Sequence, residues 1–139
     1  VASRGLGDVY KREVFDQWLM PVFIGEWMFG PKVQQEQVVS LENKVRRGGE
    51  FAFKVIRKST EIVHTGEYIE LDVPNKLVFS WSDNLHRSSK SQVTVLFQEA
   101  NNKTRLKITI KLDPKLYNEK DSFKKQWSAR CSALAAKFK

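Results

Sequence analysis

The stretch VRRGGEFAF, residues 45–53, sets two adjacent glycines directly before a run in which aromatic side chains alternate with small or charged ones. Alternation with a period of two predicts a β-strand with one buried face. Glycine reaches positive φ angles without steric cost, so Gly48 and Gly49 suit a tight connection between two long strands. A phosphate-binding nest is the alternative, because Arg46 and Arg47 are adjacent. We favour the structural turn.

The same period of two recurs along most of the chain. Six segments alternate apolar with polar side chains, separated by short turns such as VPNK and EANNK: residues 39–45, 51–55, 61–72, 77–81, 93–97 and 106–112. Residues 61–72 carry apolar side chains at both parities, so the pattern does not assign their faces. Strands of this kind, joined by short turns, predict an antiparallel sheet with one buried face.

The two ends of the chain show helical spacing instead. Asp8 can cap a first helix, whose apolar residues recur three and four apart up to Trp18, and Pro21 is expected to end it. Residues 22–28 predict a second short helix. Residues 119–138 predict a C-terminal helix of about 30 Å, long enough to cross a sheet.

The C-terminal helix carries one apolar stripe. Phe123, Trp127, Leu134 and Phe138 share it, whereas Arg130 is assigned with the lysines to the polar side. We expect the stripe to be buried against the apolar face of the sheet. The predicted fold class is α+β, with an antiparallel sheet of six to seven strands curved around the long C-terminal helix and two short N-terminal helices.

The length of the chain bounds its organisation. At 139 residues we expect a single domain over residues 1–139, large enough for a substantial core. Residues 1–8 are expected to be poorly structured or the remnant of a strand, and the start at Val1 is typical of a trimmed chain. The single cysteine, Cys131, excludes an internal disulfide and suits a reducing cytoplasm, which is the expected location.

The net charge is basic but dispersed. Lysine and arginine exceed aspartate and glutamate by 8, which permits contact with an acidic protein, nucleic acid or an anionic membrane. The densest basic spots are pairs, at residues 46–47 and 124–125, whereas nucleic-acid-binding modules gather basic residues on one face. Nucleic acid is therefore not an expected partner. No apolar run approaches the roughly 18 residues of a membrane span.

Few residues carry chemistry that would suit an active site. His64 and His86 have no Cys, Asp or Glu at metal-binding spacing, so we expect no metal and no cofactor. Cys131 has no recognisable base beside it and is expected to be a small buried hydrophobe. We predict no catalytic residue, which favours a non-catalytic protein over an enzyme.

Several motifs together resemble a known family. They are VFDQWLMP at residues 14–21, Trp27, GGEFAF at 48–53, GEYIELDVPNKLVFSW at 66–81, SQVTVLFQEANNKTRLKITI at 91–110 and the helix around Trp127. Their order and spacing are similar to the Aha-type branch of the START-like (SRPBCC, Bet v-like) superfamily, which is named for the activator of the heat-shock protein 90 ATPase. The resemblance covers roughly residues 9–138.

The resemblance implies a helix-grip fold with seven strands around a long C-terminal helix, and a cavity between sheet and helix. One departure concerns the strand that the family places before its first helix. Here the residues available for it, VASRGLG, form a poor strand pattern. The first strand is therefore expected to be missing, short or irregular, which leaves open whether a second copy of the chain supplies it.

The expected cavity lies between the sheet and the C-terminal helix, with its mouth near residues 83–91 and 113–118. Seven aromatic side chains are predicted to line it: Phe51, Phe53, Phe79, Trp81, Phe97, Phe123 and Trp127. Dense packing of the same rings into a filled core is the alternative. Three polar side chains are further candidates for groups inside the cavity: Arg57, His64 and Tyr68.

Three functions follow as hypotheses. We favour non-catalytic binding of a hydrophobic small molecule, lipid-like or aromatic, in that cavity. The second hypothesis is a co-chaperone-like interaction module that binds an acidic protein and acts in the stress response. The third is a START-like cyclase or hydrolase, which requires polar groups in the cavity. A monomer or a homodimer is expected.

Overall fold

Two short helices, six strands and one long helix follow one another in the computed structural model, which describes residues 7–29, 36–86, 89–100 and 103–137. A short 3-10 helix, η1, precedes the long helix. In chain order the elements are α1 (Gly7–Asp16), α2 (Pro21–Trp27), β1 (Gln37–Asn43), β2 (Glu50–Arg57), β3 (Thr60–Asp72), β4 (Lys76–Asp83), β5 (Ser91–Ala100), β6 (Lys103–Lys111), η1 (Pro114–Glu119) and α3 (Lys120–Ala136).

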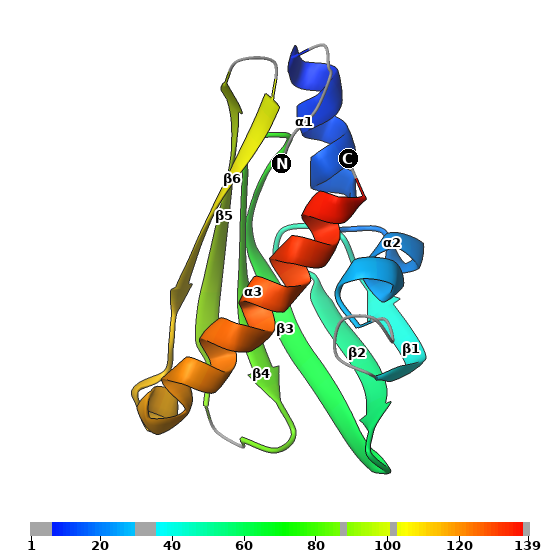
Figure 1. Ribbon diagram of the computed structural model, residues 1–139, viewed down its shortest axis with the longest axis vertical. Coiled ribbons are helices and arrows are strands. Elements are labelled where there is room, and N and C mark those ends of the chain that lie inside the picture. The colour runs from blue at the N-terminus through cyan, green and yellow to red at the C-terminus, as the bar shows by residue number, and fades with distance from the viewer. Residues whose placement is uncertain (1–6, 30–35, 87–88, 101–102, 138–139) are drawn as a thin grey trace.

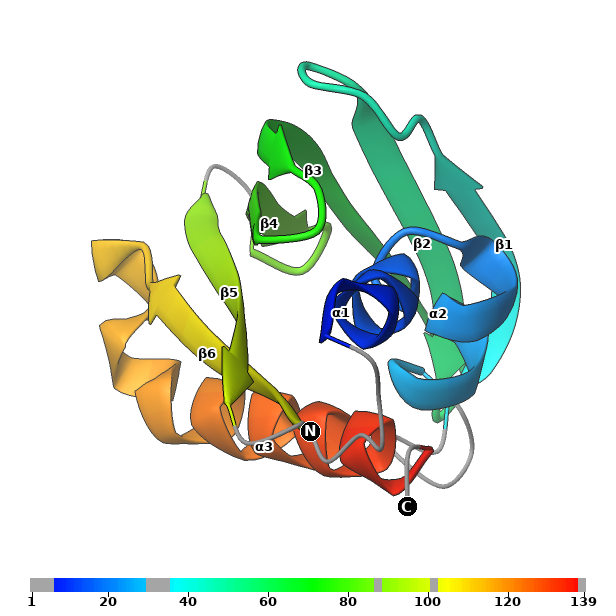
Figure 2. The same cartoon turned by 90° about the horizontal axis from the view of Figure 1, so that it is seen from above.

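The six strands form one antiparallel sheet in which each strand pairs with its neighbour in sequence, so β1 and β6 are the two edges. The sheet is strongly curved, and α3 crosses its concave side from the end of β6 towards α2 (Figure 1). Viewed from above, α1 lies inside the arc of strands and α3 closes its open side (Figure 2). The predicted fold class is therefore confirmed, with six strands in the described part of the chain.

Alternation along the strands explains which side of the sheet is buried. In β2, Phe51, Phe53 and Val55 are buried, while the residues between them are partly exposed. Strand β4 differs because residues 77–81 are all buried, so both of its faces are covered. The buried faces of these central strands, together with α1, α2 and α3, form one hydrophobic core.

The glycine pair before β2 is a structural turn, as predicted. Gly48 has a φ of 81°, in the left-handed region that glycine adopts most easily. Its N–H donates to the Tyr68 carbonyl at 2.8 Å, and Tyr68 N–H donates to the Gly49 carbonyl at 2.9 Å. A Cβ atom on Gly49 would lie 2.1 Å from the Lys44 carbonyl oxygen, so no larger residue fits without a shift of the backbone.

The N-terminal helices differ in one detail from the prediction. Helix α1 ends at Asp16, and Pro21 begins α2 instead of ending α1. Proline suits this position because the first turn of a helix leaves its N–H groups without partners. Residues 1–6, where a remnant of a first strand was expected, lie outside the described residues, while Gly7 and Asp8 belong to α1.

The long helix confirms the predicted stripe and corrects one residue in it. Phe123 packs against the core, and Trp127 and Leu134 are buried in it. Arg130, assigned to the polar side, is 1% exposed, because residues 123, 127, 130 and 134 follow the spacing of a single helix face. Phe138 lies outside the described residues. Within the described ranges no helix is both long and apolar enough to cross a membrane.

Candidate functional site

Four of the seven aromatic side chains predicted to line a cavity pack against one another in the core. Phe51, Phe53, Phe79 and Trp81 are each buried, and the ring centroid of Phe51 lies 4.7 Å from that of Phe53 and 5.8 Å from that of Phe79. With three neighbours they surround a void of about 10 Å³. That volume is close to the minimum that holds one water molecule.

Of the other three predicted residues, Phe97 and Trp127 are buried in the same core and Phe123 packs against it. Phe97 is on β5, where its ring centroid is 4.7 Å from that of Phe15 in α1. Phe123 and Trp127 are on α3 and line a groove between this helix and β6. Six of the seven side chains are thus buried in the core, and Phe123 and Trp127 also line the groove.

The groove between β6 and α3 has a volume of about 380 Å³, within the range of small-molecule sites. Its walls are mainly apolar, because β6 turns every second side chain towards α3 and the helix turns its aromatic stripe towards β6. The lining residues are Ile108, Ile110, Leu112, Lys120, Phe123, Lys124, Trp127, Ser128 and Cys131.

The charged side chains at this groove are both cationic. Lys120 and Lys124 are exposed and lie one helical turn apart at the start of α3. None of the described residues that line the groove is acidic. An apolar floor with ammonium groups at the rim suits a ligand with an apolar body and no positive charge of its own.

A second feature is a cluster of four ionisable side chains, of which three are buried and Arg57 is partly exposed. Glu36 precedes β1, Arg57 ends β2, His64 lies in β3 and Arg130 in α3. Glu36 Oε1 is 3.3 Å from Arg57 Nη2. Arg130 Nε donates a hydrogen bond of 3.1 Å to the carbonyl oxygen of Met28. We refer to these four residues as the buried polar cluster.

Aromatic rings enclose the buried polar cluster. The Arg130 guanidinium carbon lies 5.4 Å from the ring centroids of Phe29 and Trp81, and 4.9 Å from that of Trp127. The His64 ring stacks on the same Phe29 and Trp81, at 5.2 and 4.8 Å. These cation–π contacts partly replace the water that a guanidinium loses on burial.

Burial also sets the protonation states in the cluster. Loss of hydration lowers the pKa of His64 well below 6.5, and the charges of Arg130 and Arg57 lower it further, so His64 is neutral near pH 7. Burial lowers the pKa of Arg130 to about 10, which leaves it charged. Burial raises the pKa of Glu36 above 4.5, although Arg57 and Arg130 act in the opposite direction.

Many polar atoms in and beside this cluster lack a hydrogen-bond partner. The Glu36–Arg57 contact is close, but it does not have hydrogen-bond geometry. Buried polar atoms normally find partners, so these atoms mark a place where water or a ligand group would be stabilised. The atoms are Glu36 Oε1 and Oε2, Arg57 Nε, His64 Nδ1 and Nε2, Arg130 Nη2, Trp18 Nε1 and Trp127 Nε1.

Of the three polar residues proposed from the sequence, Arg57 and His64 meet in the cluster and Tyr68 does not. The Tyr68 hydroxyl donates to Asn43 Oδ1, and burial raises the pKa of Tyr68 to about 12. Sequence reasoning missed Glu36 and Arg130. The spacing of Arg130 from Phe123 and Trp127 was an available signal, whereas nothing in the local pattern marks Glu36.

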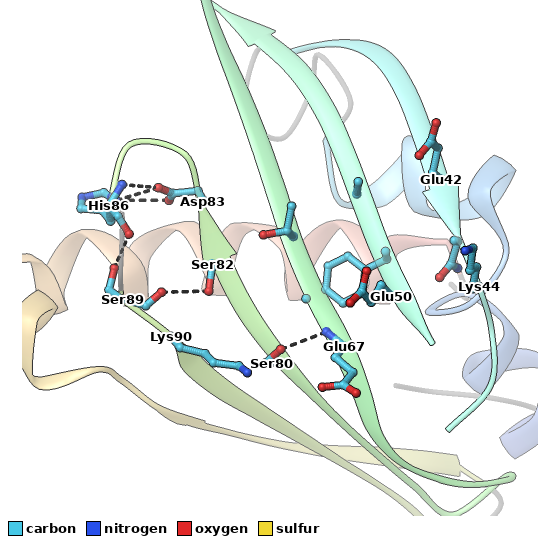
Figure 3. A pocket seen from close by; sticks show the side chains of 15 residues that line it. Glu42, Lys44, Glu50, Glu67, Ser80, Ser82, Asp83, His86, Ser89 and Lys90 are labelled. Atoms are coloured by element: carbon cyan, nitrogen blue, oxygen red, sulfur yellow. Dashed lines mark hydrogen bonds and ion pairs between the residues drawn. The ribbon is translucent and has the colours of Figure 1, made fainter. Parts of the chain in front are cut away.

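The outer face of the sheet carries a larger but polar hollow of about 780 Å³ (Figure 3). Its labelled side chains include carboxylates and ammonium groups that face solvent, with hydrogen bonds that tie Ser80 to Glu67 and Ser82 to Ser89. Such a surface is easily hydrated, because most of the residues that line it are polar or charged. The groove between β6 and α3 is the stronger candidate for binding an organic ligand.

His86 links the loop after β4 to the end of η1, directly before α3, through its two ring nitrogens. Its Nδ1 is 2.9 Å from Asp83 Oδ1, and its Nε2 is 2.7 Å from Glu119 Oε2. Burial alone would lower the pKa of His86, but the hydrogen bonds and charges of Asp83 and Glu119 outweigh it and raise the pKa above 6.5. Asp113 adds a second tie, since its Oδ2 accepts from Lys90 N–H at 2.7 Å.

Catalytic and metal-binding groups are sparse in the part of the chain that the structure describes. It contains no group of three His, Cys, Asp or Glu side chains arranged to hold a metal ion. Burial raises the pKa of Cys131 to about 11, so its thiol is protonated near pH 7 and is a weak nucleophile.

Comparison with known proteins shows the family of this chain. Solved structures with the same fold include CV1439 from Chromobacterium violaceum, with 17% identity, a TM-score of 0.76, and 92% of this chain and 89% of that chain covered. An AHSA1-like protein from Aeromonas hydrophila matches with 16% identity, a TM-score of 0.68, and 91% and 85% coverage. None of the curated proteins matches. Residues 8–139 match the family described as "Activator of Hsp90 ATPase homolog 1-like protein", and the chain belongs to that family.

Proposed function

We propose that this protein binds a small hydrophobic molecule, lipid-like or aromatic, in the groove between β6 and α3, without converting it chemically. The observation that carries this proposal is a concave site of about 380 Å³ whose walls are mainly apolar. Pockets of this kind are the usual sites of small-molecule binding. Phe123 and Trp127, two residues of the predicted lining, form its helical wall.

The groove can be tested by filling it. Ser128 is an exposed residue of α3 that lines the groove, and Ser132 is an exposed residue one turn later that does not. We expect the neutral fluorescent probe N-phenylnaphthylamine to bind the unmodified protein. Ser128→Trp should weaken this binding by at least about tenfold, because the indole occupies the same space, whereas Ser132→Trp should not.

Two results would contradict the proposal. One is a wild-type protein that takes up none of the probe, and the other is equal affinity in wild type and Ser128→Trp. Native mass spectrometry of protein purified from its own host is the complementary measurement. A bound hydrophobic compound at one molecule per chain would name the natural ligand class.

Binding of an acidic protein is the second candidate function, and the basic edge of the sheet favours it. Arg105, Lys107 and Lys111 are exposed along β6, the last strand of the sheet. A co-chaperone role predicts binding to heat-shock protein 90 that weakens as salt rises. Calorimetry that detects no binding at low salt would remove this candidate.

A cyclase or hydrolase function has weaker support. It would need substrate to reach polar groups such as His64 and Arg130, which are 4% and 1% exposed. Contact with either residue would require the surrounding rings to move. Binding of an apolar molecule in the groove alone requires no such rearrangement.

A further inference from the structure

The buried polar cluster carries one positive charge more than it can neutralise. Arg130 is a buried cation, and Arg57 is a cation whose side chain is 28% exposed. Glu36 is the one carboxylate of the cluster and lies 3.3 Å from Arg57, and His64 is neutral near pH 7. Proteins rarely bury a charge without a counter-charge, because the lost hydration is costly. The surroundings of Arg130, the fully buried cation of the cluster, would therefore stabilise an added anion.

The hydrogen-bond pattern of the cluster indicates the same deficit. Arg130 Nη2 and Arg57 Nε are buried donors without partners. Arg130 Nε donates its hydrogen bond to a neutral acceptor, the carbonyl oxygen of Met28. A carboxylate can accept from a guanidinium through two parallel bonds, which is the strongest pairing open to arginine.

Trp127 connects the cluster to the groove. Its side chain lines the groove, and its ring centroid lies 4.9 Å from the Arg130 guanidinium carbon. Its indole Nε1 is a further buried donor without a partner. Arg130 itself does not line the groove, so an anionic group on a molecule bound there would have to displace the Trp127 indole ring to meet donors from both Trp127 and Arg130.

From this geometry we propose that the cluster around Arg130 recognises the carboxylate of an amphipathic acid whose apolar body lies in the groove. The apolar part of this inference rests on the proposed function. The carboxylate would supply a negative charge and accept hydrogen bonds from Arg130 Nη2 and Trp127 Nε1. Lys120 and Lys124 at the rim would attract the same class of ligand from solvent.

The experiment compares two ligands of equal chain length, decanoate and decanol, by displacement of N-phenylnaphthylamine at neutral pH. We expect wild type to bind decanoate at least about tenfold more tightly than decanol. Arg130→Met should lose this preference and keep the affinity for decanol. Lys125→Met, on an exposed position of the same helix outside the groove lining, should keep both.

Glu36→Gln provides a test that does not depend on the folding of Arg130→Met. It removes the carboxylate that competes for Arg57, so the preference for decanoate should increase by at least about threefold. An unchanged preference in Glu36→Gln, or a preference that survives in Arg130→Met, would overturn the proposal. If the preference for decanoate disappears instead in the double variant Lys120→Met/Lys124→Met, the lysines at the rim recognise the acid and the cluster does not.

Failure of this inference is distinguishable from failure of the proposed function. Equal binding of decanoate and decanol to wild type would refute carboxylate recognition and leave the apolar groove in place. Binding of neither ligand would refute the groove itself, and carboxylate recognition with it. Acetate serves as the remaining probe: if acetate alone raises the melting temperature as much as decanoate does, the cluster binds free carboxylates and the link to the groove is wrong.

Discussion

Replacing Arg130 with methionine should make the ligand-free protein more stable. A guanidinium pKa of about 10 in place of 12.5 means that its surroundings, burial above all, disfavour the charged form by about 3 kcal/mol. Methionine has no charge to desolvate, and its thioether can keep contact with the rings of Phe29, Trp81 and Trp127. The hydrogen bond to the Met28 carbonyl is lost, at a cost of about 1–2 kcal/mol.

The balance of these effects is a gain of about 1–2 kcal/mol, or a melting temperature higher by roughly 3–6 °C. Differential scanning calorimetry at neutral pH, in a buffer free of carboxylic acids, measures it directly. Lys125→Met is the matched control on the exposed side of α3 and should change the melting temperature by less than about 1 °C. A cooperative melting transition that moves down by several degrees in Arg130→Met would show that the guanidinium is fully compensated in the folded protein.

The remaining predictions concern the sheet and the two histidines. Gly66→Ala should lower the free energy of unfolding, measured in urea, by at least about 3 kcal/mol, because a Cβ there would lie 2.0 Å from the backbone oxygen of Ser80. Gly25→Ala is the control: its Cβ would lie 3.4 Å from the nearest atom, so its free energy of unfolding should stay within about 1 kcal/mol of wild type. The pKa of His64 is lowered in the folded protein, so on acidification the unfolded chain binds a proton at this residue before the folded protein does. Stability therefore falls as pH drops below 6.5, and His64→Phe should remove that loss. His86 has a raised pKa, so its contribution to stability is fully present below pH 6.5 and disappears as pH rises through the pKa of the folded protein. His86→Gln should therefore destabilise the protein more in acid than in alkali. Equal destabilisation at both pH values would contradict this.

A stabilising Arg130→Met variant would have a functional meaning. Buried charges that lower stability persist where a function requires them, since stability and activity often compete at the same site. The same variant should lose selectivity for the acid over the alcohol. The two measurements together would separate a cluster built for recognition from one that is only tolerated by the fold.

The sequence by itself determined most of the secondary structure. Alternation in β2 and the other strands predicted six strands in the order observed, and the spacing of Phe123, Trp127 and Leu134 predicted a long helix with its apolar side against the sheet. The glycine pair at residues 48–49 was also interpretable, because the requirement for positive φ is local. Patterns of this kind depend on neighbours within a few residues, which the sequence displays directly.

Only the tertiary structure decided where space and charge lie. The rings that the sequence grouped around one cavity mostly fill the core, and two of them, Phe123 and Trp127, also line the groove beside β6. The buried polar cluster joins Arg130 to Met28 across 102 residues of chain, and to Glu36, which no local pattern marks. Free volume and charge pairing depend on how elements distant in sequence pack together. Periodicity therefore shows which side of an element is buried, but not which residues that side contacts.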